Sequence, residues 1–266
     1  MRRLLFFLHN IYHRRDIIIA MARRELGSRY AGTLGGFLWV VAQPVATVLV
    51  FWFVFSVGFK VTGPTGMPFI LYFACGYVPW LFFSEVLAAS TNGVIGNAHL
   101  VKKIAFPTEI IPITYMVAGL VAHIALIMVA FGIALINGLP PSFHIFQIIY
   151  YFIALCVFSL GLSWVLAALN VFHRDIGQGM AVILNLWFWM TPIVWGQNII
   201  PDRYHWLIEI NPILYVVDGY RNALVYHEWI FPDLVQSMYF WGIAIGVFGF
   251  GGYIFKRLKP EFADVL

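Results

Sequence analysis

The stretch that decides the fold is LGGFLWVVAQPVATVLVFWFVFSVGF, residues 34–59, which contains no charged side chain. A membrane-spanning helix needs about 20 consecutive, mainly apolar residues. Over the whole chain of 266 residues, 62% are hydrophobic and 11% are charged, with a mean hydropathy of +0.85. Soluble domains carry roughly 45–50% apolar and about 25% charged residues. The sequence therefore predicts an all-α polytopic membrane protein and excludes a soluble domain.

Five further apolar stretches follow this first one along the chain. We predict six transmembrane helices, over residues 34–59, 69–91, 108–136, 145–171, 179–195 and 234–255. The fifth has only 17 residues, so it needs support from the segment that follows it. Residues 34–256 are expected to form one transmembrane domain, preceded by a cytoplasmic segment, residues 1–33, and followed by a cytoplasmic tail, residues 257–266.

The basic residues are distributed unevenly around these spans, although the net charge is only +4. Of the 16 Lys and Arg side chains, 13 fall in four segments on one predicted side: residues 1–33, 92–107, 172–178 and 256–266. Cytoplasmic loops carry an excess of Lys and Arg, so this split predicts that both termini are cytoplasmic. Because the basic residues flank apolar spans, we expect anionic lipid rather than nucleic acid beside them.

Three segments outside the spans are too apolar to be free loops. Residues 1–33 interleave Arg with Ile, Met and Leu, which predicts an amphipathic helix in the cytoplasmic interface. Residues 92–107 predict a second, shorter amphipathic helix. Residues 196–233 predict half-buried helices or a re-entrant hairpin on the outer face. Irregular backbone at membrane depth is tolerated only where protein or a water-filled cavity covers it, so we expect a pathway near residues 196–233.

The sequence contains no recognisable catalytic or metal-binding motif. No G-x-x-x-x-G-K-[ST] string is present, so the chain is not expected to hydrolyse ATP by itself. The triplet His173-Arg174-Asp175 lacks the companion motifs of a kinase. The two cysteines, Cys75 and Cys156, lie in separate apolar runs. We therefore predict a transport subunit with no catalytic residue, no metal and no cofactor of its own.

Two ionisable side chains fall inside predicted spans, and such groups are functional hypotheses by default. For Glu85, a functional role and a position reaching the cytoplasmic interface stay equally open. For His123, a hydrogen-bonded packing role is favoured. Two isolated groups do not make the chain of carboxylates that proton coupling would suggest, which argues against an ion-driven transporter.

Aromatic side chains are concentrated in the first and fifth spans. Trp52, Phe55 and Phe59 have the spacing i, i+3, i+7, which predicts one shared helix face. Trp187 and Trp189 lie in the fifth span. One interpretation is packing or lipid contact. The other is a channel wall, because sugar rings present apolar C–H faces that aromatic rings accept while the polymer slides.

Several motifs resemble a known family when they are taken in order. They are Arg23-Arg24-Glu25-Leu26, Arg29-Tyr30-Ala31-Gly32-Thr33-Leu34-Gly35, Leu38-Trp39, Gln43-Pro44, Asn97-Ala98-His99-Leu100-Val101-Lys102-Lys103-Ile104-Ala105-Phe106-Pro107, Asn211-Pro212 and Tyr220-Arg221. On a six-span frame this set resembles the membrane subunit of type-2 ABC exporters. Within that class it is most similar to the polysaccharide permeases for O-antigen, capsule and teichoic acid. The resemblance covers roughly Arg23 to Pro260.

The resemblance implies a permease half that pairs with a second copy of itself and with two ATP-binding-cassette ATPases, which hold the ATP and Mg. It implies an inner-membrane location in a bacterium and a polyprenyl-pyrophosphate-linked glycan as cargo, with the O-antigen type favoured. It also implies a coupling helix against the ATPase, for which the candidate residues are Leu100, Val101, Lys102, Lys103, Ile104 and Phe106.

Two further sets of candidate residues concern the cargo. Arg23, Arg24 and Arg29 are candidates to attract the pyrophosphate at a lateral entrance, because Arg matches phosphate oxygens bidentately. The alternative role for these arginines is anchoring to anionic lipid. The candidates for the sugar-facing wall, between two copies, are Trp52, Phe55, Trp187 and Trp189.

Other functions stay open. The same scaffold could export teichoic acid, capsule, or a small lipid or drug. A membrane-embedded glycosyltransferase or acyltransferase would need clustered carboxylates or histidines at one interface, and the sequence has none.

Overall fold

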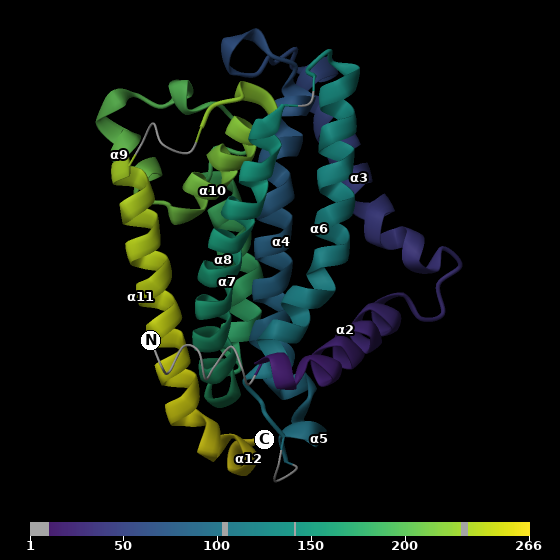
Figure 1. Cartoon of the computed structure of the whole chain (residues 1–266), viewed down its shortest axis with the longest axis vertical. Helices are drawn as coiled ribbons and strands as arrows, with labels where there is room; N and C mark the ends of the chain where they lie inside the picture. The colour runs from purple at the N-terminus through teal and green to yellow at the C-terminus, as the bar shows by residue number, and fades with distance from the viewer. Residues whose placement is uncertain (1–10, 103–105, 141, 230–233) are drawn as a thin grey trace.

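The computed structural model describes residues 11–102, 106–140, 142–229 and 234–266. Within these residues every regular element is a helix. Long helices run along the longest axis of the molecule, and shorter ones lie at its two ends (Figure 1). The prediction of an all-α polytopic membrane protein is confirmed.

Five described segments are long and apolar enough to cross a membrane: Gly36–Gly58, Phe69–Gly96, Ile110–Ile136, Phe143–Phe172 and Leu234–Val265. They contain the long helices α3 (Trp39–Trp52), α4 (Phe69–Gly96), α6 (Ile110–Ile136), α7 (Gln147–Phe172) and α11 (Leu234–Leu258). These helices overlap the first, second, third, fourth and sixth predicted spans.

The helix at the fifth predicted span, α8, is shorter than a full span. It covers Asp175–Met190, 16 residues. At a rise of about 1.5 Å per residue this is roughly 24 Å, less than the hydrocarbon core of about 30 Å. The count of six spans therefore stays a prediction.

Helix α4 forms the centre of the bundle, and most of its side chains are buried. It packs against α6 on one side and α7 on the other. Helix α11 packs against α7 through small residues, since a Cβ at Gly161 would lie only 2.7 Å from the Cα of Phe248. Small residues of this kind let helix backbones approach closely in a membrane.

Helix α3 is the least enclosed of the long helices. Val40, Pro44 and Val48 are its buried residues. It continues directly into a π-helix, η2 (Phe53–Gly58), in which no residue is buried. One side of this span therefore faces lipid or another chain.

The short helices divide between the two ends of the bundle. Helices α2 (Arg15–Tyr30), α5 (Ala98–Val101) and α12 (Phe262–Val265) share one end, whereas α9 (His205–Glu209) and α10 (Pro212–Arg221) lie toward the other (Figure 1). The remaining short turns of helix are η1 (Gly36–Leu38), η3 (Pro64–Gly66), η4 (Phe143–Phe146), η5 (Gln197–Ile199), η6 (Asp202–Tyr204), η7 (Asn222–Tyr226) and η8 (Lys259–Glu261).

Helix α2 lies across the end of the bundle instead of along it (Figure 1). It is connected to the first span through Gly32 and Gly36, which take φ angles of 78° and 48°. Glycine adopts this left-handed region without the steric cost that a Cβ brings. In α2 itself Ile18 is buried but its neighbours Ile17 and Ile19 are exposed, so the helix has only a narrow buried stripe.

Candidate functional site

Asn211 positions the start of α10 against the end of α8. Its side-chain oxygen accepts hydrogen bonds from the backbone N–H of Ile213, at 3.2 Å, and from Nε1 of Trp187, at 2.9 Å. Its amide nitrogen donates to Oγ1 of Thr191 at 2.8 Å. An Asn before a Pro at the first helical position is a strong helix start. One residue therefore caps α10 and holds it beside the last turn of α8.

At the other end of α10 the side chain of Arg221 is almost completely enclosed, with 1% of its surface exposed. Its Nη1 donates to Oδ1 of Asp218 at 3.0 Å, and its Nη2 donates to the backbone carbonyl of Pro192 at 2.8 Å. The guanidinium lies 3.7 Å from the centre of the Tyr72 ring. A buried charge needs such partners to offset its desolvation. Arg221 therefore fixes the chain that leaves α8.

Two glycines make room for this arrangement. A Cβ at Gly76 of α4 would lie 2.8 Å from Nη2 of Arg221, and a Cβ at Gly219 would collide with the ring of Tyr151. The guanidinium and the Tyr151 ring can therefore lie directly against helix backbone.

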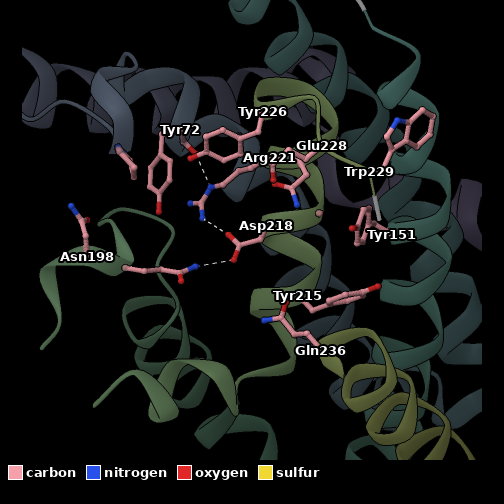
Figure 2. A pocket seen from close by; sticks show the side chains of 14 residues that line it. Tyr72, Tyr151, Asn198, Tyr215, Asp218, Arg221, Tyr226, Glu228, Trp229 and Gln236 are labelled. Atoms are coloured by element: carbon pink, nitrogen blue, oxygen red, sulfur yellow. Dashed lines mark hydrogen bonds and ion pairs between the residues drawn. The ribbon is translucent and has the colours of Figure 1, made fainter. Parts of the chain in front are cut away.

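A cavity of about 680 Å³ opens beside this network (Figure 2). Figure 2 shows Trp229 and Tyr151 on one side of it and Tyr72 and Asn198 on the other, with the Arg221–Asp218 pair between them. Its lining combines tyrosine and tryptophan rings, amide side chains and charged groups; these are Pro64, Tyr72, Tyr151, Gln197, Asn198, Tyr215, Asp218, Gly219, Arg221, Asn222, Tyr226, Glu228, Trp229 and Gln236.

The sequence predicts a pathway near residues 196–233, and Asp218 is a site residue that this prediction does not name. A signal was available, because Asp218 and Arg221 stand at i, i+3 in an otherwise apolar helix that begins at Asn-Pro.

A second ionic cluster lies at the opposite end of the bundle. Glu109, just before α6, accepts from Nη1 of Arg14 at 2.7 Å and from Nζ of Lys259 at 2.6 Å. Partial burial alone would raise the pKa of Glu109, but the hydrogen bonds and the charge from Lys259, with help from Arg14, hold that pKa below its usual value. The backbone carbonyl of Glu109 also accepts from Nε1 of Trp164, at 3.1 Å. Glu109 therefore connects α6 and α7 to both ends of the chain.

The three arginines predicted to attract pyrophosphate have different surroundings. Arg24 donates to Oδ1 of Asn97 at 2.8 Å. Arg29 donates to Oε1 of Glu25 at 3.0 Å, and its Nη1 lies 3.8 Å from Oε2 of Glu85. Arg23 is exposed. Glu85 is therefore in contact with α2, as the interpretation of a group reaching the interface requires.

The predicted coupling residues lie only partly in a helix. Leu100 and Val101 belong to α5, which has four residues. Val101 is 8% exposed and packs into this chain's own core, Leu100 and Phe106 are half-buried, and Lys102 is exposed. Lys103 and Ile104 lie outside the described residues.

The four aromatic wall candidates separate into two exposed and two packed side chains. Trp52 and Trp189 are 39% and 49% exposed. Phe55 stacks on Phe69 of α4 with ring centres 5.1 Å apart. Trp187 meets Phe83 edge to face, with ring centres 5.2 Å apart. The structure does not bring the four residues together on one surface of the chain.

The expected common face of Trp52, Phe55 and Phe59 needs a correction. The rings in contact are Phe51, Phe55 and Phe59, with centres 5.9 and 5.6 Å apart, and Trp52 lies outside this row. Side chains four apart share one face of a helix, so the row runs from α3 into η2.

The hydrogen-bonded packing role predicted for His123 is confirmed. Its Nε2 lies 2.9 Å from the hydroxyl of Tyr220, and the side chain is 3% exposed between aromatic rings. Among residues 11–102, 106–140, 142–229 and 234–266, no three His, Cys, Asp or Glu side chains gather as a metal site would require.

The chain is similar to known transport proteins over nearly its whole length. It is 27% identical over 259 residues to the O-antigen export system permease protein RfbA of Klebsiella pneumoniae, covering 97% of this chain and 98% of the relative. It is 26% identical over 259 residues to the protein of the same name from Myxococcus xanthus, covering the same shares of the two chains. The polysialic acid transport protein KpsM of Escherichia coli is 20% identical over 211 residues, 77% of this chain and 80% of that protein.

The family to which the chain belongs follows from a match over most of its length. The model of the ABC-2 type transporter family matches residues 17–225, which run from the first turn of α2 past the end of α10 and include the Arg221–Asp218 pair. This confirms the resemblance that the ordered motifs indicate and the prediction of a transport subunit. The protein is a multi-pass membrane protein that belongs to the ABC-2 type transporter family.

Proposed function

We propose that this chain is the permease half of an ATP-driven exporter that moves a lipid-linked polysaccharide of the O-antigen type across the inner membrane of a bacterium. The observation that carries this proposal is the end-to-end alignment with O-antigen export permeases from two organisms. The polysialic acid and capsule polysaccharide transport proteins align at 18–20% identity and over less of this chain. The O-antigen type is therefore favoured over capsule.

The α2 end of the bundle is proposed to face the cytoplasm, with both termini on that side. Basic side chains support this orientation, because α2 and the segment from Lys256 to Lys259 lie at this end with α5 and α12 (Figure 1). Lys and Arg near spans favour the cytoplasmic side. The cavity beside Arg221 would then open toward the outer face.

A cysteine-labelling experiment tests the orientation. Asp202 and His99 are exposed residues of η6 and α5. With Ala at Cys75 and Cys156, an impermeant thiol reagent added outside should label Asp202→Cys and spare His99→Cys. The reverse labelling would overturn the orientation.

The conduit is proposed to form between two copies of this chain, with α3 and α8 at the shared surface. The poor enclosure of α3 and the exposure of Trp52 and Trp189 support this. Phe55 and Trp187 would stand behind the wall and hold its helices in place. Alanine at Trp52 or Trp189 should reduce export, whereas Phe or Tyr at either position should largely preserve it.

Two ATP-binding-cassette ATPases are proposed to bind beneath α5 and to supply the ATP and Mg chemistry. Among the described coupling candidates, Leu100 and Phe106 are half-buried and Lys102 is exposed, so parts of all three remain available to a partner. Leu100→Asp should uncouple ATP hydrolysis from export while the permease still reaches the membrane, because buried apolar anchors carry most of the energy of an interface. Unchanged export would remove α5 from the mechanism.

The lipid pyrophosphate is proposed to approach along α2. Arg23 is exposed, whereas Arg29 is already paired with Glu25, so a phosphate group would have to compete with carboxylates at Arg29. Lys at Arg23, Arg24 and Arg29 keeps the charge but removes the bidentate geometry. If these arginines bind the pyrophosphate headgroup specifically, export by the triple Lys variant should fall. Normal export by that variant would mean that the arginines only anchor the helix to anionic lipid.

Deletion of the gene tests the proposed function as a whole. A strain without this chain should accumulate lipid-linked glycan on the cytoplasmic side of the membrane. The same glycan should be missing from the cell surface. Expression of the chain together with its ATPase should restore display. Unchanged surface glycan in the deletion strain would overturn the proposal.

A further inference from the structure

The cavity beside Arg221 has the size and the ring content of a small-molecule site. Its volume of about 680 Å³ lies within the range of roughly 300–1,000 Å³ that is usual for such sites. Five of its lining residues are aromatic: Tyr72, Tyr151, Tyr215, Tyr226 and Trp229. Trp229 is 54% exposed at its edge, so one large ring faces the opening.

Two aromatic rings of this cavity, those of Tyr151 and Tyr215, are held in place by close contacts. The ring of Tyr151 lies against the backbone at Gly219 and meets Tyr215 edge to face, with ring centres 5.4 Å apart. The hydroxyl of Tyr215 is 3.0 Å from that of Tyr150 and 2.9 Å from Oγ of Ser237. Such rigid walls suit a ligand that presents flat apolar faces, because little side-chain freedom is lost on binding.

The segment that carries Glu228 and Trp229 is also fixed. The backbone N–H of Glu228 donates to the carbonyl of Asn222 at 3.2 Å, and its carbonyl accepts from Nε2 of Gln147 at 2.8 Å. His227 has a φ of 55°, and the preceding turn, η7, is a π-helix. A π-turn and a left-handed non-glycine residue are costly features that cluster at binding sites.

The polar lining consists mainly of groups that pair with hydroxyls. Gln197, Asn198, Asn222 and Gln236 supply amides, a group that carries both donors and an acceptor, and Nε2 of Gln197 donates to Oδ2 of Asp218 at 2.8 Å. These amides line the same cavity as the aromatic rings. Flat apolar faces edged with hydroxyls are the chemistry of a sugar ring.

The charge balance of the lining favours an uncharged ligand. Asp218 and Glu228 are acidic, and Arg221 is the basic residue of the lining. The Arg221 guanidinium donates to Asp218 and to the backbone carbonyls of Tyr72, Pro192 and Ile193, so it has little capacity left for an anion. Glu228 is exposed and would repel a carboxylate or phosphate on the ligand.

We infer that this cavity is a glycan-binding subsite within each chain, and that it accepts a short run of uncharged sugars and discriminates against acidic polymers. The inference rests on the proposed function and deepens it by naming the class of glycan. It concerns a site inside one protomer, separate from the wall between two copies.

A titration of the full-length chain in nanodiscs tests the inference. The probes are mannotetraose, which is uncharged, and tetrasialic acid, which carries four carboxylates; ligand-detected NMR gives the dissociation constants. Mannotetraose should bind saturably and at least tenfold more tightly than tetrasialic acid. No saturable binding of mannotetraose, or equal affinity for both probes, would overturn the inference.

Matched variants assign the binding to this cavity. Trp229→Ala should weaken mannotetraose binding roughly tenfold, and Trp229→Tyr should retain most of it, because the flat ring remains. Trp206→Ala is the control, since Trp206 on α9 is also 54% exposed but does not line the cavity. An equal loss in the Trp206 and Trp229 variants would place the sugar elsewhere.

A charge variant tests the discrimination separately. Glu228→Gln removes the exposed negative charge and keeps a hydrogen-bonding side chain. It should raise the affinity for tetrasialic acid about fivefold, the effect of one unit charge about 4 Å away in water, and change mannotetraose binding less than twofold. No gain for tetrasialic acid would remove Glu228 as the source of selectivity and overturn that part of the inference.

The deletion strain separates this inference from the proposed function. If glycan display depends on the chain but the purified chain binds no mannotetraose, the export function stands and the subsite is wrong. If display does not depend on the chain, the export function is wrong whatever the titration shows.

Discussion

The two ends of the bundle carry ion pairs of opposite character. At the α9 end, Arg221 is 1% exposed and lies 3.0 Å from Asp218, whose side chain borders the cavity and is 29% exposed. At the α2 end, Glu109 binds Arg14 and Lys259 at 2.7 and 2.6 Å, but the three side chains are 31–37% exposed. The shorter distances are at the more exposed site. Burial, not distance, therefore decides which contact the fold depends on, because water screens exposed pairs and leaves buried ones unscreened.

The partners of the two clusters differ as well. Arg221 donates to backbone carbonyls of α4 and of the chain after α8, so removing it would take a charged donor away from three carbonyls inside the fold. Glu109 is contacted by long, partly exposed side chains that water can replace. The α9 end should consequently be sensitive to single substitutions and the α2 end tolerant of them.

The largest expected effect comes from breaking the buried pair. Arg221→Met should destabilise the protein by roughly 2–4 kcal/mol, because it takes a charged donor away from three backbone carbonyls and leaves Asp218 without its cation. Thermal unfolding of the purified chain in detergent, followed by loss of monodisperse protein, measures this. The control is the double variant Arg221→Met with Asp218→Asn, which should recover part of the loss. A single variant as stable as wild type would contradict the contrast between the two ends.

The close approach of Tyr151 to α10 should give the next largest effect. Gly219→Ala should cost about 1–3 kcal/mol, because a methyl group would collide with the Tyr151 ring. Gly242→Ala on α11 is the matched control, since a Cβ there meets nothing within 4 Å. In the same unfolding measurement, Gly219→Ala should be clearly less stable than Gly242→Ala. Equal stability of the two variants would mean that the ring moves away freely.

Two neighbouring tryptophans provide a smaller test at the end of α8. Trp187→Phe should cost about 1 kcal/mol, because it removes the hydrogen bond to Asn211 that holds α10. Trp189→Phe should have little effect on stability, since the side chain is half exposed. Protease resistance of the loop between α8 and α10 provides a local readout. A larger effect at Trp189 than at Trp187 would reverse the assignment of which ring is packed.

The smallest expected effect at neutral pH is at the α2 end. Glu109→Gln should lower the free energy of unfolding by about 0.5–1 kcal/mol. Added salt screens the ion pair, so it should reduce the difference in stability between this variant and the wild-type chain. The folded-state pKa of Glu109 lies below its ordinary value of 4.5. Its contribution to stability is therefore complete above pH 4.5 and is lost as the pH falls through the lower, folded-state pKa.

Lowering the pH should therefore reduce the difference in stability between the wild-type chain and Glu109→Gln. Between pH 6 and pH 3 the melting temperature of the wild-type chain should fall more than that of Glu109→Gln. Plots of melting temperature against pH for the two proteins should therefore converge at low pH. Parallel curves would show that Glu109 carries no pH-linked stability.

The sequence predicts the long helices well, because long apolar runs bounded by charges can satisfy their backbone in a membrane only as helices. The packing role of His123 and the contact of Glu85 with Arg29 of α2 also agree with interpretations available from sequence. The family resemblance agrees with the match over residues 17–225.

The candidate site was less accessible to sequence reasoning. Asp218 and Arg221 are visible as an i, i+3 pair, but the contacts that bury Arg221 come from residues 28, 29 and 149 positions away. Trp187 and Trp189 look equivalent in the sequence, yet one is packed against α4 and the other is exposed. Helical spacing predicts a face with Trp52, whereas the ring that contacts Phe55 from the preceding turn is Phe51.

By itself, the sequence determined that this chain is a helical membrane protein, where its long apolar helices lie and which family it resembles, because hydropathy and ordered motifs are properties of contiguous residues. The tertiary structure alone decided which aromatic rings are enclosed, which arginine is buried and where a cavity remains. Those outcomes depend on which faces of distant helices meet, and close packing between them is set by side chains that are not neighbours in the chain.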